Sequence, residues 1–410
     1  MSAIVAVVVL AGCSGQAQPA EVLVGEPTRD STVVPVADPG LLRWADGTPV
    51  VSDPVDVAAA RLAVPGTDYD VVYTVPSGGV DDGYLVPMRL TADGRAVAAQ
   101  VPATSYDDGP WLTAPTTMGS LDGAAFTPFA AARPIAGDHP RQAFDASVAE
   151  GVTAWLETDS TQVGTPRWRV FAAGAGGRAT LVARAEEVGD GGSDMAGWTT
   201  VSHGRVYWAA GAPGHMDVFS RAADGSGPLV MVATGVSQPT DSSAGVVVVR
   251  SELDDPAVPP GEASVERVVD GEQPQVVVRR SGAPGSALVQ LVADGDVLAF
   301  VATTPAQSGG TLYVVDTRAR TARTVTLHGS GREASLALCD GRLQWSEADA
   351  QGLGTSVPTY VLDLVSSDLA RIDVDHAFSG ALCGGRYLAW SQLDAAAGSS
   401  ASTVVARWDR

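Results

Sequence analysis

Short runs of alternating hydrophobic and polar residues, separated by glycine-bearing turns, cover most of this chain. The clearest are LCDGRLQW, from Leu338 to Trp345, and LCGGRYLAW, from Leu382 to Trp390. Alternation over four to eight residues predicts half-buried β-strands. Asp-Gly or Gly-Gly between apolar runs predicts tight hairpins, because glycine adopts positive φ at little cost. The pattern therefore predicts an all-β protein.

The hairpin recurs at a regular period. Its second strand ends six times in a large or branched residue, at intervals of 41 to 53 residues: Trp155, Trp208, Val249, Phe300, Trp345 and Trp390. Two further apolar runs around a polar turn follow each hairpin, so one repeat predicts four antiparallel strands. Four strands per repeat in tandem predict a β-propeller, whose blades stack around a centre. We expect Trp155, Trp208, Phe300, Trp345 and Trp390 to pack between blades.

The number of blades follows from counting these repeats. Six units are clear or fair from Ala143 onward, and a weaker one is expected upstream, from Tyr69 through the strands that follow Gly83. The stretch Pro102–Gln142 is either a long excursion or a degenerate blade. Seven blades are therefore expected, and six or eight remain open.

The last repeat ends at Arg410 with only its third strand. An unpaired outer edge would invite aggregation, so another strand must complete this blade. We expect an N-terminal strand, around Ser31–Pro35 or Leu41–Trp44, to close the ring.

The composition agrees with a folded, turn-rich chain, and the net charge limits the kinds of binding partner that can be expected. Hydrophobic residues make up 45% of the chain, with 46 glycines and 26 prolines, which is too apolar for disorder. The net charge of −21, from 47 acidic and 26 basic residues, would repel a phosphate backbone. We therefore do not expect this protein to bind nucleic acid.

The N-terminal sequence MSAIVAVVVLAGCSG suggests a cellular location. Its apolar run ends at Ala11 and is far shorter than the ~20 residues that a spanning helix needs. The Leu-Ala-Gly-Cys ending at Cys13 resembles the lipobox of bacterial lipoproteins, although no basic residue precedes the apolar run. The resemblance implies a signal peptide over residues 1–12, lipidation of Cys13 and anchoring on the extracytoplasmic side of the cell membrane. Residues 13–30 then form the lipid anchor and a flexible tether, and 31–410 the propeller domain; a buried N-terminal strand is the alternative.

The two other cysteines occupy the same place in neighbouring repeats. Cys339 and Cys383 are 44 residues apart, each before a Gly-bearing turn. An even pair in an oxidising compartment suggests a disulfide. Two reduced, buried thiols are the alternative.

The sequence offers no motif for catalysis, metal binding or a cofactor. It contains no G-x-S-x-G, no H-E-x-x-H and no Cys-x-x-Cys. SDMAGW, from Ser193, is a single broken version of the repeated box of sialidases. We therefore expect no catalytic residues, no metal site and no cofactor.

A family resemblance supports the architecture. ADGDVLAF followed by TLYVVDT, within Ala293 to Thr317, resembles the propeller repeats of the Tol system's periplasmic component and of WD-like repeat proteins. The resemblance implies a rigid disc that presents loops to a protein or a small ligand at one face. We therefore expect a non-catalytic, lipid-anchored binding or scaffolding module at the cell envelope. The alternative is an extracellular glycan-acting hydrolase with carboxylates at the channel mouth.

Overall fold

The computed structural model is almost entirely β-strand. Its described residues are 41–77, 84–102, 114–130, 140–160, 167–189, 195–212, 214–268, 272–303, 310–327, 334–346, 358–373, 380–394 and 400–409. Within these ranges, two short 3-10 turns interrupt the strands, η1 (Val57–Ala59) and η2 (Ala185–Glu187). The expectation of an all-β chain is confirmed.

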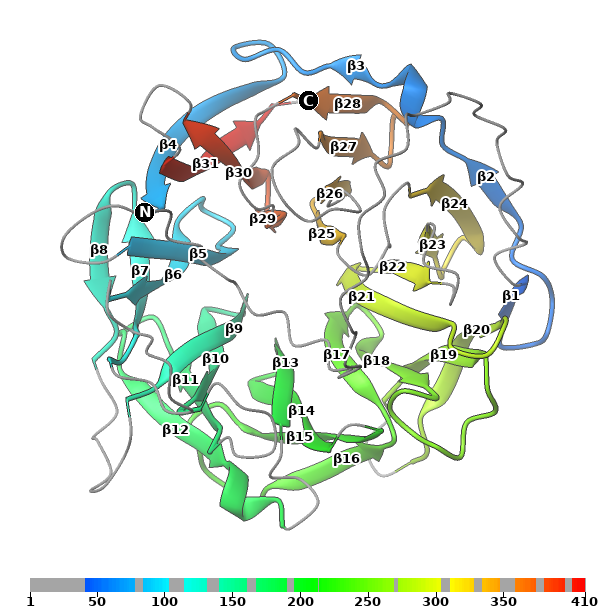
Figure 1. The fold of residues 1–410 in the computed structure, drawn as a ribbon, viewed down its shortest axis with the longest axis horizontal. Helices are drawn as coiled ribbons and strands as arrows, with labels where there is room; N and C mark the ends of the chain where they lie inside the picture. The colour runs from blue at the N-terminus through cyan, green and yellow to red at the C-terminus, as the bar shows by residue number, and fades with distance from the viewer. Residues whose placement is uncertain are drawn as a thin grey trace, which may run out of the picture. The chain divides into compact units, whose positions relative to one another are not determined.

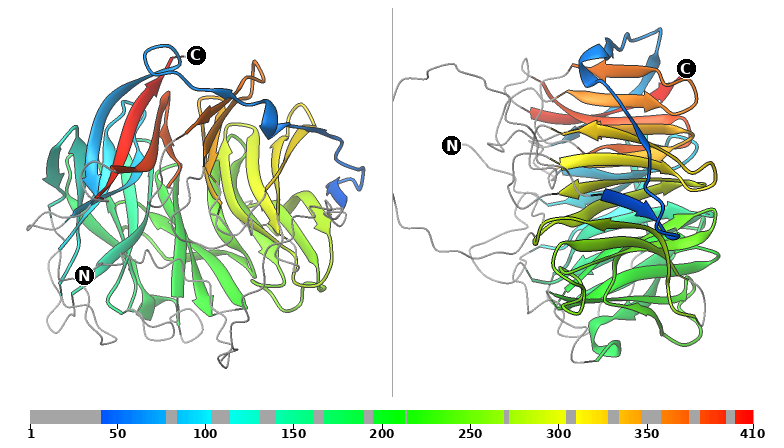
Figure 2. Two further views of the ribbon diagram at one scale, coloured as in Figure 1. Left: turned by 45° about the horizontal axis from the view of Figure 1, so that its top comes forward. Right: turned by 90° about the vertical axis from the view of Figure 1, so that its right-hand side faces the viewer.

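Seven antiparallel sheets form a propeller ring, with the first strand of each blade nearest the centre (Figures 1 and 2). Blades 1 to 3 contain β5 (Tyr84–Leu90), β6 (Ala96–Val101), β7 (Thr117–Asp122), β8 (Ala125–Pro128); β9 (Gln142–Ala149), β10 (Val152–Thr158), β11 (Arg169–Ala173), β12 (Ala179–Arg184); and β13 (Met195–Ser202), β14 (Arg205–Ala212), β15 (His215–Ala222), β16 (Val230–Thr234). The expected seven blades are confirmed.

The remaining four blades follow the same order from the centre outward. Blades 4 to 6 contain β17 (Ser237–Ser242), β18 (Gly245–Ser251), β19 (Glu262–Arg267), β20 (Gln275–Ser281); β21 (Ala287–Asp294), β22 (Val297–Thr303), β23 (Gly310–Asp316), β24 (Thr321–Thr326); and β25 (Ser335–Cys339), β26 (Arg342–Ser346), β27 (Thr359–Asp363), β28 (Leu369–Ile372). Blade 7 contains β29 (Leu382–Gly384), β30 (Tyr387–Asp394), β31 (Ser400–Trp408) and a strand from the start of the chain.

That closing strand is β4 (Tyr69–Ser77), which pairs antiparallel with β31. The expectation that an N-terminal strand closes the ring is confirmed, but Leu41–Trp44 was the wrong strand. β1 (Leu41–Trp44) has four residues and cannot cover β31, whereas β4 and β31 have nine each. The other candidate, Ser31–Pro35, lies outside the described residues.

The start of blade 1 also differs from the expectation. Tyr69–Ser77 belongs to blade 7, so the first blade begins only at Tyr84. Its third and fourth strands, β7 and β8, lie within the stretch Pro102–Gln142, which the sequence left undecided. That stretch therefore contains half of a blade.

The segment before β4 runs around the outside of three blades, along the blue outer trace of Figure 1. β1 pairs antiparallel with β20 of blade 4, β2 (Ser52–Pro54) parallel with β24 of blade 5, and β3 (Arg61–Leu62) parallel with β28 of blade 6. We call residues Leu41–Leu62 the N-terminal strap. The strap gives blades 4, 5 and 6 a fifth strand each.

Aromatic pairs repeat from blade to blade and fill the seams between them. In four blades the aromatic residue of the second strand lies directly opposite an aromatic residue of the third. The stacked pairs are Trp155–Phe171 (ring centroids 5.5 Å apart), Trp208–Phe219 (6.2 Å), Phe300–Tyr313 (5.7 Å) and Trp345–Tyr360 (5.0 Å). Each sheet is too small to bury these rings alone, so neighbouring blades stabilise one another.

Candidate functional site

The large residues selected from the repeats are buried. Their exposed fractions are 2% or less: Trp155, Trp208, Phe300, Trp345 and Trp390. Phe129 of blade 1 stacks on Trp155 of blade 2, and Trp168 meets Trp208 across the next seam. Because these rings contact protein on both sides, they serve packing and are not available to a ligand.

A disulfide joins Cys339, at the end of β25, to Cys383 in β29. Their Cα atoms are 6.2 Å apart, a separation that suits a disulfide. The bond therefore links the innermost strands of blades 6 and 7. Cys13, the predicted lipidation site, lies outside the described residues.

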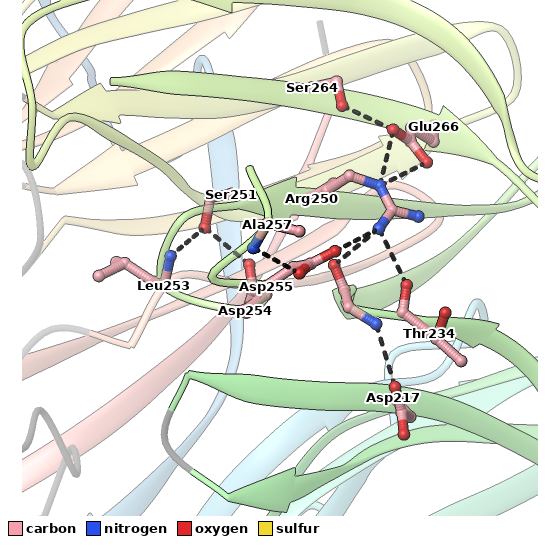
Figure 3. Close-up of polar contacts among 11 residues, drawn as sticks. Asp217, Thr234, Arg250, Ser251, Leu253, Asp254, Asp255, Ala257, Ser264 and Glu266 are labelled. Atoms are coloured by element: carbon pink, nitrogen blue, oxygen red, sulfur yellow. Dashed lines mark hydrogen bonds and ion pairs between the residues drawn. The ribbon is translucent and has the colours of Figure 1, made fainter. Parts of the chain in front are cut away.

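A cluster of charged residues connects blades 3 and 4 (Figure 3). Arg250, on β18, donates to both carboxylate oxygens of Glu266 at 3.0 and 3.1 Å. The same guanidinium donates to the Thr234 carbonyl at 3.0 Å and to Asp255 at 3.3 Å. Arg250 thus ties its own blade to the crossover that leaves blade 3.

Asp254 is the buried carboxyl of this cluster. Its residue is 6% exposed, and Ser251 donates to its carboxylate at 2.7 Å. Burial raises the pKa of Asp254 to about 6, although hydrogen bonds from Ser251 and Ser237 oppose the shift. Its backbone carbonyl accepts from Met216 N–H at 3.0 Å, so the loop is also pinned to blade 3.

A carboxyl with a raised pKa is the group that a glycosidase uses as its acid. Asp254 does not fit this role well, because serine hydroxyls surround its oxygens and protein covers it. Its neighbour Asp255 is held by Arg250 and by the N–H of Ala257, 2.9 Å away. The cluster therefore fixes a loop between two blades and leaves neither carboxylate directed at a ligand.

The innermost strands of blades 1 to 5 each contain a β-bulge. Their pairing with the second strand slips by one residue, at Met88, Phe144, Trp198, Gln238–Pro239 and Gln290–Leu291. Three of these residues have positive φ: Trp198 at 51°, Gln238 at 54° and Gln290 at 59°. Bulges re-aim side chains and recur next to functional sites, so the bulged residues of the inner strands are candidates for such a site.

Two bulged residues are exposed aromatics on neighbouring blades. Phe144 on β9 is 39% exposed and Trp198 on β13 is 43% exposed, whereas the other tryptophans in the described ranges are at most 7% exposed. The carboxylate of Asp145 accepts hydrogen bonds from the backbone N–H and the hydroxyl of Thr199. These bonds join the two bulges, so Phe144 and Trp198, which we call the aromatic pair, flank one inter-blade contact.

The bulge of blade 4 serves a different purpose. Gln238 is 6% exposed, and its amide donates to the Leu288 carbonyl at 3.3 Å. Its amide oxygen accepts from Leu291 N–H at 2.9 Å. This strained residue is therefore used inside the protein to connect blades 4 and 5, and the aromatic pair is the candidate ligand surface.

Sequence reasoning missed the aromatic pair. SDMAGW contains Trp198, but a broken sialidase box gave no reason to separate this tryptophan from the packing ones. Hydrophobic alternation cannot reveal a bulge, because one extra residue shifts the pattern without marking it. Glycine before Trp198 was the only local signal, since Gly within a strand often marks a bulge.

Within the described ranges, no three His, Cys, Asp or Glu residues gather in a way that could hold a metal ion. None of the helices in those ranges has the length and hydrophobicity to cross a membrane.

No family model matches the sequence, and no curated protein matches it. Solved structures do match. A prolyl endopeptidase matches with a TM-score of 0.46 and 16% identity over 65% of this chain, which spans 42% of that protein's length. TolB from Acinetobacter baumannii matches with a TM-score of 0.37 and 10% identity, over 66% of this chain and 80% of that one.

An oligogalacturonate lyase from Vibrio parahaemolyticus has a TM-score of 0.37 and 9% identity, over 83% of this chain and 98% of that one. At these identities the likeness concerns the fold alone. The chain is a seven-bladed β-propeller protein, and no activity is transferred to it from these proteins.

Proposed function

We propose that this chain is a non-catalytic binding or scaffolding module, held on the extracytoplasmic side of the cell membrane by a lipid on Cys13. The aromatic pair carries the proposal. A tryptophan that only packs gains nothing from being 43% exposed, and a bulky residue at positive φ costs about 1–2 kcal/mol. Strain retained at an exposed aromatic suggests a role in binding.

The disulfide supports the proposed location. Disulfides persist in oxidising compartments and are rare in the cytosol of most organisms. The bond between Cys339 and Cys383 therefore agrees with the export that the resemblance at Cys13 implies.

The Arg250 cluster supports a binding role over hydrolysis. Asp254 is the carboxyl whose pKa is raised by burial, and it is enclosed between blades. No observation on the described residues favours glycan hydrolysis, so we advance no second function.

The test uses the full chain with a C-terminal tag in bacterial cells. Metabolic labelling with a radioactive fatty acid should label the wild-type chain in the membrane fraction, whereas Cys13→Ser should be unlabelled and leave that fraction. Chemical cross-linking on intact cells should give a discrete partner band for the wild type.

The matched variants are Phe144→Ala with Trp198→Ala, and Met231→Ala, which removes an apolar side chain 54% exposed on the outer strand β16. The partner band should be lost with the first and kept with the second. Absence of a partner band for the wild type would overturn the proposal, and turnover of a glycan panel by the purified chain would favour hydrolysis in its place.

A further inference from the structure

The aromatic pair differs from every other aromatic group on the described part of the ring. Phe144 and Trp198 are the two aromatics among its exposed large hydrophobic residues. The remaining exposed members of that group are aliphatic, such as Met231 and Val365. The two residues lie on the innermost strands of adjacent blades, and each is partly open to solvent.

The backbone holds Trp198 in place at a cost. The residue sits at φ 51°, a conformation that bulky residues rarely adopt, and glycine occupies the preceding position instead of this one. Glycine at position 198 would remove the backbone strain. We therefore infer that the indole is retained for a contact outside the packed interior.

The charges on the inner strands indicate which ligand the rings would accept. The charged residues on the described innermost strands are three acids, Asp145 beside the aromatic pair and Asp241 and Asp294 on blades 4 and 5, and one base, Arg89 on blade 1. The whole chain carries a net charge of −21. An anionic ligand would be repelled, whereas a cation is attracted by the field and by the negative face of an aromatic ring.

We propose that the aromatic pair receives a cationic side chain, Arg or Lys, from an extended segment of the partner protein. The proposal rests on the binding function advanced above and specifies its chemistry. Trp198 supplies the main ring face, because tryptophan binds cations best, and Phe144 supplies a second exposed ring on the neighbouring blade. The hydrogen bonds from Thr199 to Asp145 fix the distance between the two strands that carry them.

Calorimetry on the full chain would use two peptides that differ only in charge. The first is acetyl-Gly-Arg-Gly-Arg-Gly-amide, and the second carries citrulline, the neutral isostere of arginine, in place of both arginines. The wild-type chain should bind the arginine peptide about tenfold more tightly than the citrulline peptide, because a desolvated cation–π contact is of that order.

Trp198→Ala should lower the affinity for the arginine peptide about tenfold and leave the citrulline peptide unchanged. Trp198→Phe should fall between the two, and Met231→Ala should equal the wild type. Equal binding of both peptides to the wild type, or equal binding of the arginine peptide to Trp198→Ala, would show that no cation is recognised here.

A second measurement separates binding from folding. Trp198→Gly should melt about 1–3 °C above Trp198→Ala, because glycine tolerates the positive φ that alanine does not. Both variants should lose peptide binding equally. A lower melting point for the glycine variant would mean that the strained bulge is absent in solution, and the argument from strain would fail.

The cellular cross-linking experiment distinguishes this inference from the proposed function. If the wild type and Trp198→Ala both give the partner band, the cation site is wrong and the binding module stands. If neither gives it, the proposed function itself fails.

Discussion

Blades 4 to 6 and blades 1 to 3 are built on the same four-stranded plan but differ at both edges. At the outer edge, the N-terminal strap adds a fifth strand to each of blades 4, 5 and 6, and none to blades 1, 2 and 3 among the described residues. At the inner edge, the bulge of blade 4 buries Gln238 in an inter-blade bond, whereas the bulges of blades 2 and 3 expose Phe144 and Trp198.

The difference suggests that the two halves of the ring have different roles, one in stability and the other in binding. The strapped half is held by the N-terminal strap, and its bulged glutamine is used to connect blades. The other half exposes Phe144 and the strained Trp198, where they can contact a ligand. A symmetric fold can thus confine binding to one sector because only a few residues depart from the repeat.

Side-chain contacts fix the strap to the blades. Trp44 is 7% exposed, and the Arg320 guanidinium of blade 5 lies 4.9 Å from the centre of its ring. Arg61 bonds Asp68 at 2.7 Å and Asp368 of blade 6 at 3.1 Å. The hydrogen bonds from Arg61 to Asp368 and then to Asp68 raise the pKa of this guanidinium, so it remains charged.

The largest effect is expected from removing ring closure. A chain that starts at Gly78 lacks β1 to β4, so the nine-residue strand β31 loses its outer partner β4 and blade 7 keeps three strands. We expect no cooperative thermal transition and aggregation through the open edge, measured by circular dichroism and size-exclusion chromatography.

Two longer chains are the controls. A chain that starts at Asp38 keeps every described strand, and one that starts at Ala45 loses only β1. The latter should still unfold cooperatively, with a melting point about 5–10 °C lower, because burial of Leu42 and Trp44 is lost. Equal behaviour of the Gly78 and Ala45 chains would show that β4 does not close the ring.

The second prediction compares a seam with the strap. Trp208 is fully buried between blades 2 and 3, and Trp208→Ala should cost about 4–5 kcal/mol of unfolding free energy. Trp44→Ala, at the edge of blade 4, should cost about 3 kcal/mol or less, because its cavity can fill with water. Urea unfolding with unchanged m-values measures both; the reverse order would place more of the stability in the strap than in the seams.

The repeats made most of the fold predictable. Glycine turns and large residues such as Trp208 recur every 41 to 53 positions, and each repeat must bury its rings against the next. The blade number and the need for an N-terminal closing strand follow from that count. The count does not show which N-terminal strand closes the ring. Tyr69–Ser77 does so because it matches the nine-residue length of β31, whereas Leu41–Trp44 has four residues, and the sequence pattern does not give these lengths.

The candidate site was not predictable from the same signals. Trp198 and Trp208 are ten positions apart in one blade, and one is exposed whereas the other is buried. Only the extra residue in β13 separates their environments, and a register slip is a tertiary feature that no local pattern records.

The third prediction concerns pH at the seam between blades 3 and 4. Burial raises the pKa of Asp254 to about 6 from an ordinary value of 3.8, so the native state binds the proton more tightly than the unfolded state. Its contribution to stability is therefore present below pH 3.8 and is lost as the pH rises through 6, by up to about 3 kcal/mol. Asp254→Asn should be about as stable as the wild type at pH 3.5 and more stable at pH 7.5.

Asp46 in the strap should show the opposite dependence of stability on pH. Hydrogen bonds from Thr48 lower the pKa of Asp46 to about 2, so its contribution is present above pH 3.8 and is lost as the pH falls through 2. Asp46→Asn should therefore be less stable than the wild type at pH 5, with a small difference because the residue is exposed. Denaturant unfolding at four pH values gives both difference curves; curves of the same sign would contradict the environment assigned to Asp254.

The smallest effect is expected where Arg320 covers Trp44. Arg320→Met keeps the apolar stem over the indole but removes the cation and the hydrogen bond to Asp46, 2.9 Å away. Both contacts are largely exposed, so the variant should lose about 0.5–1 kcal/mol. Arg320→Met in a Trp44→Ala chain should cost less than in the wild type, because the ring that the cation faces is gone. An equal cost in both chains would mean that Asp46 and Thr48 hold Arg320, and that the strap is attached to blade 5 by these polar contacts without help from the ring.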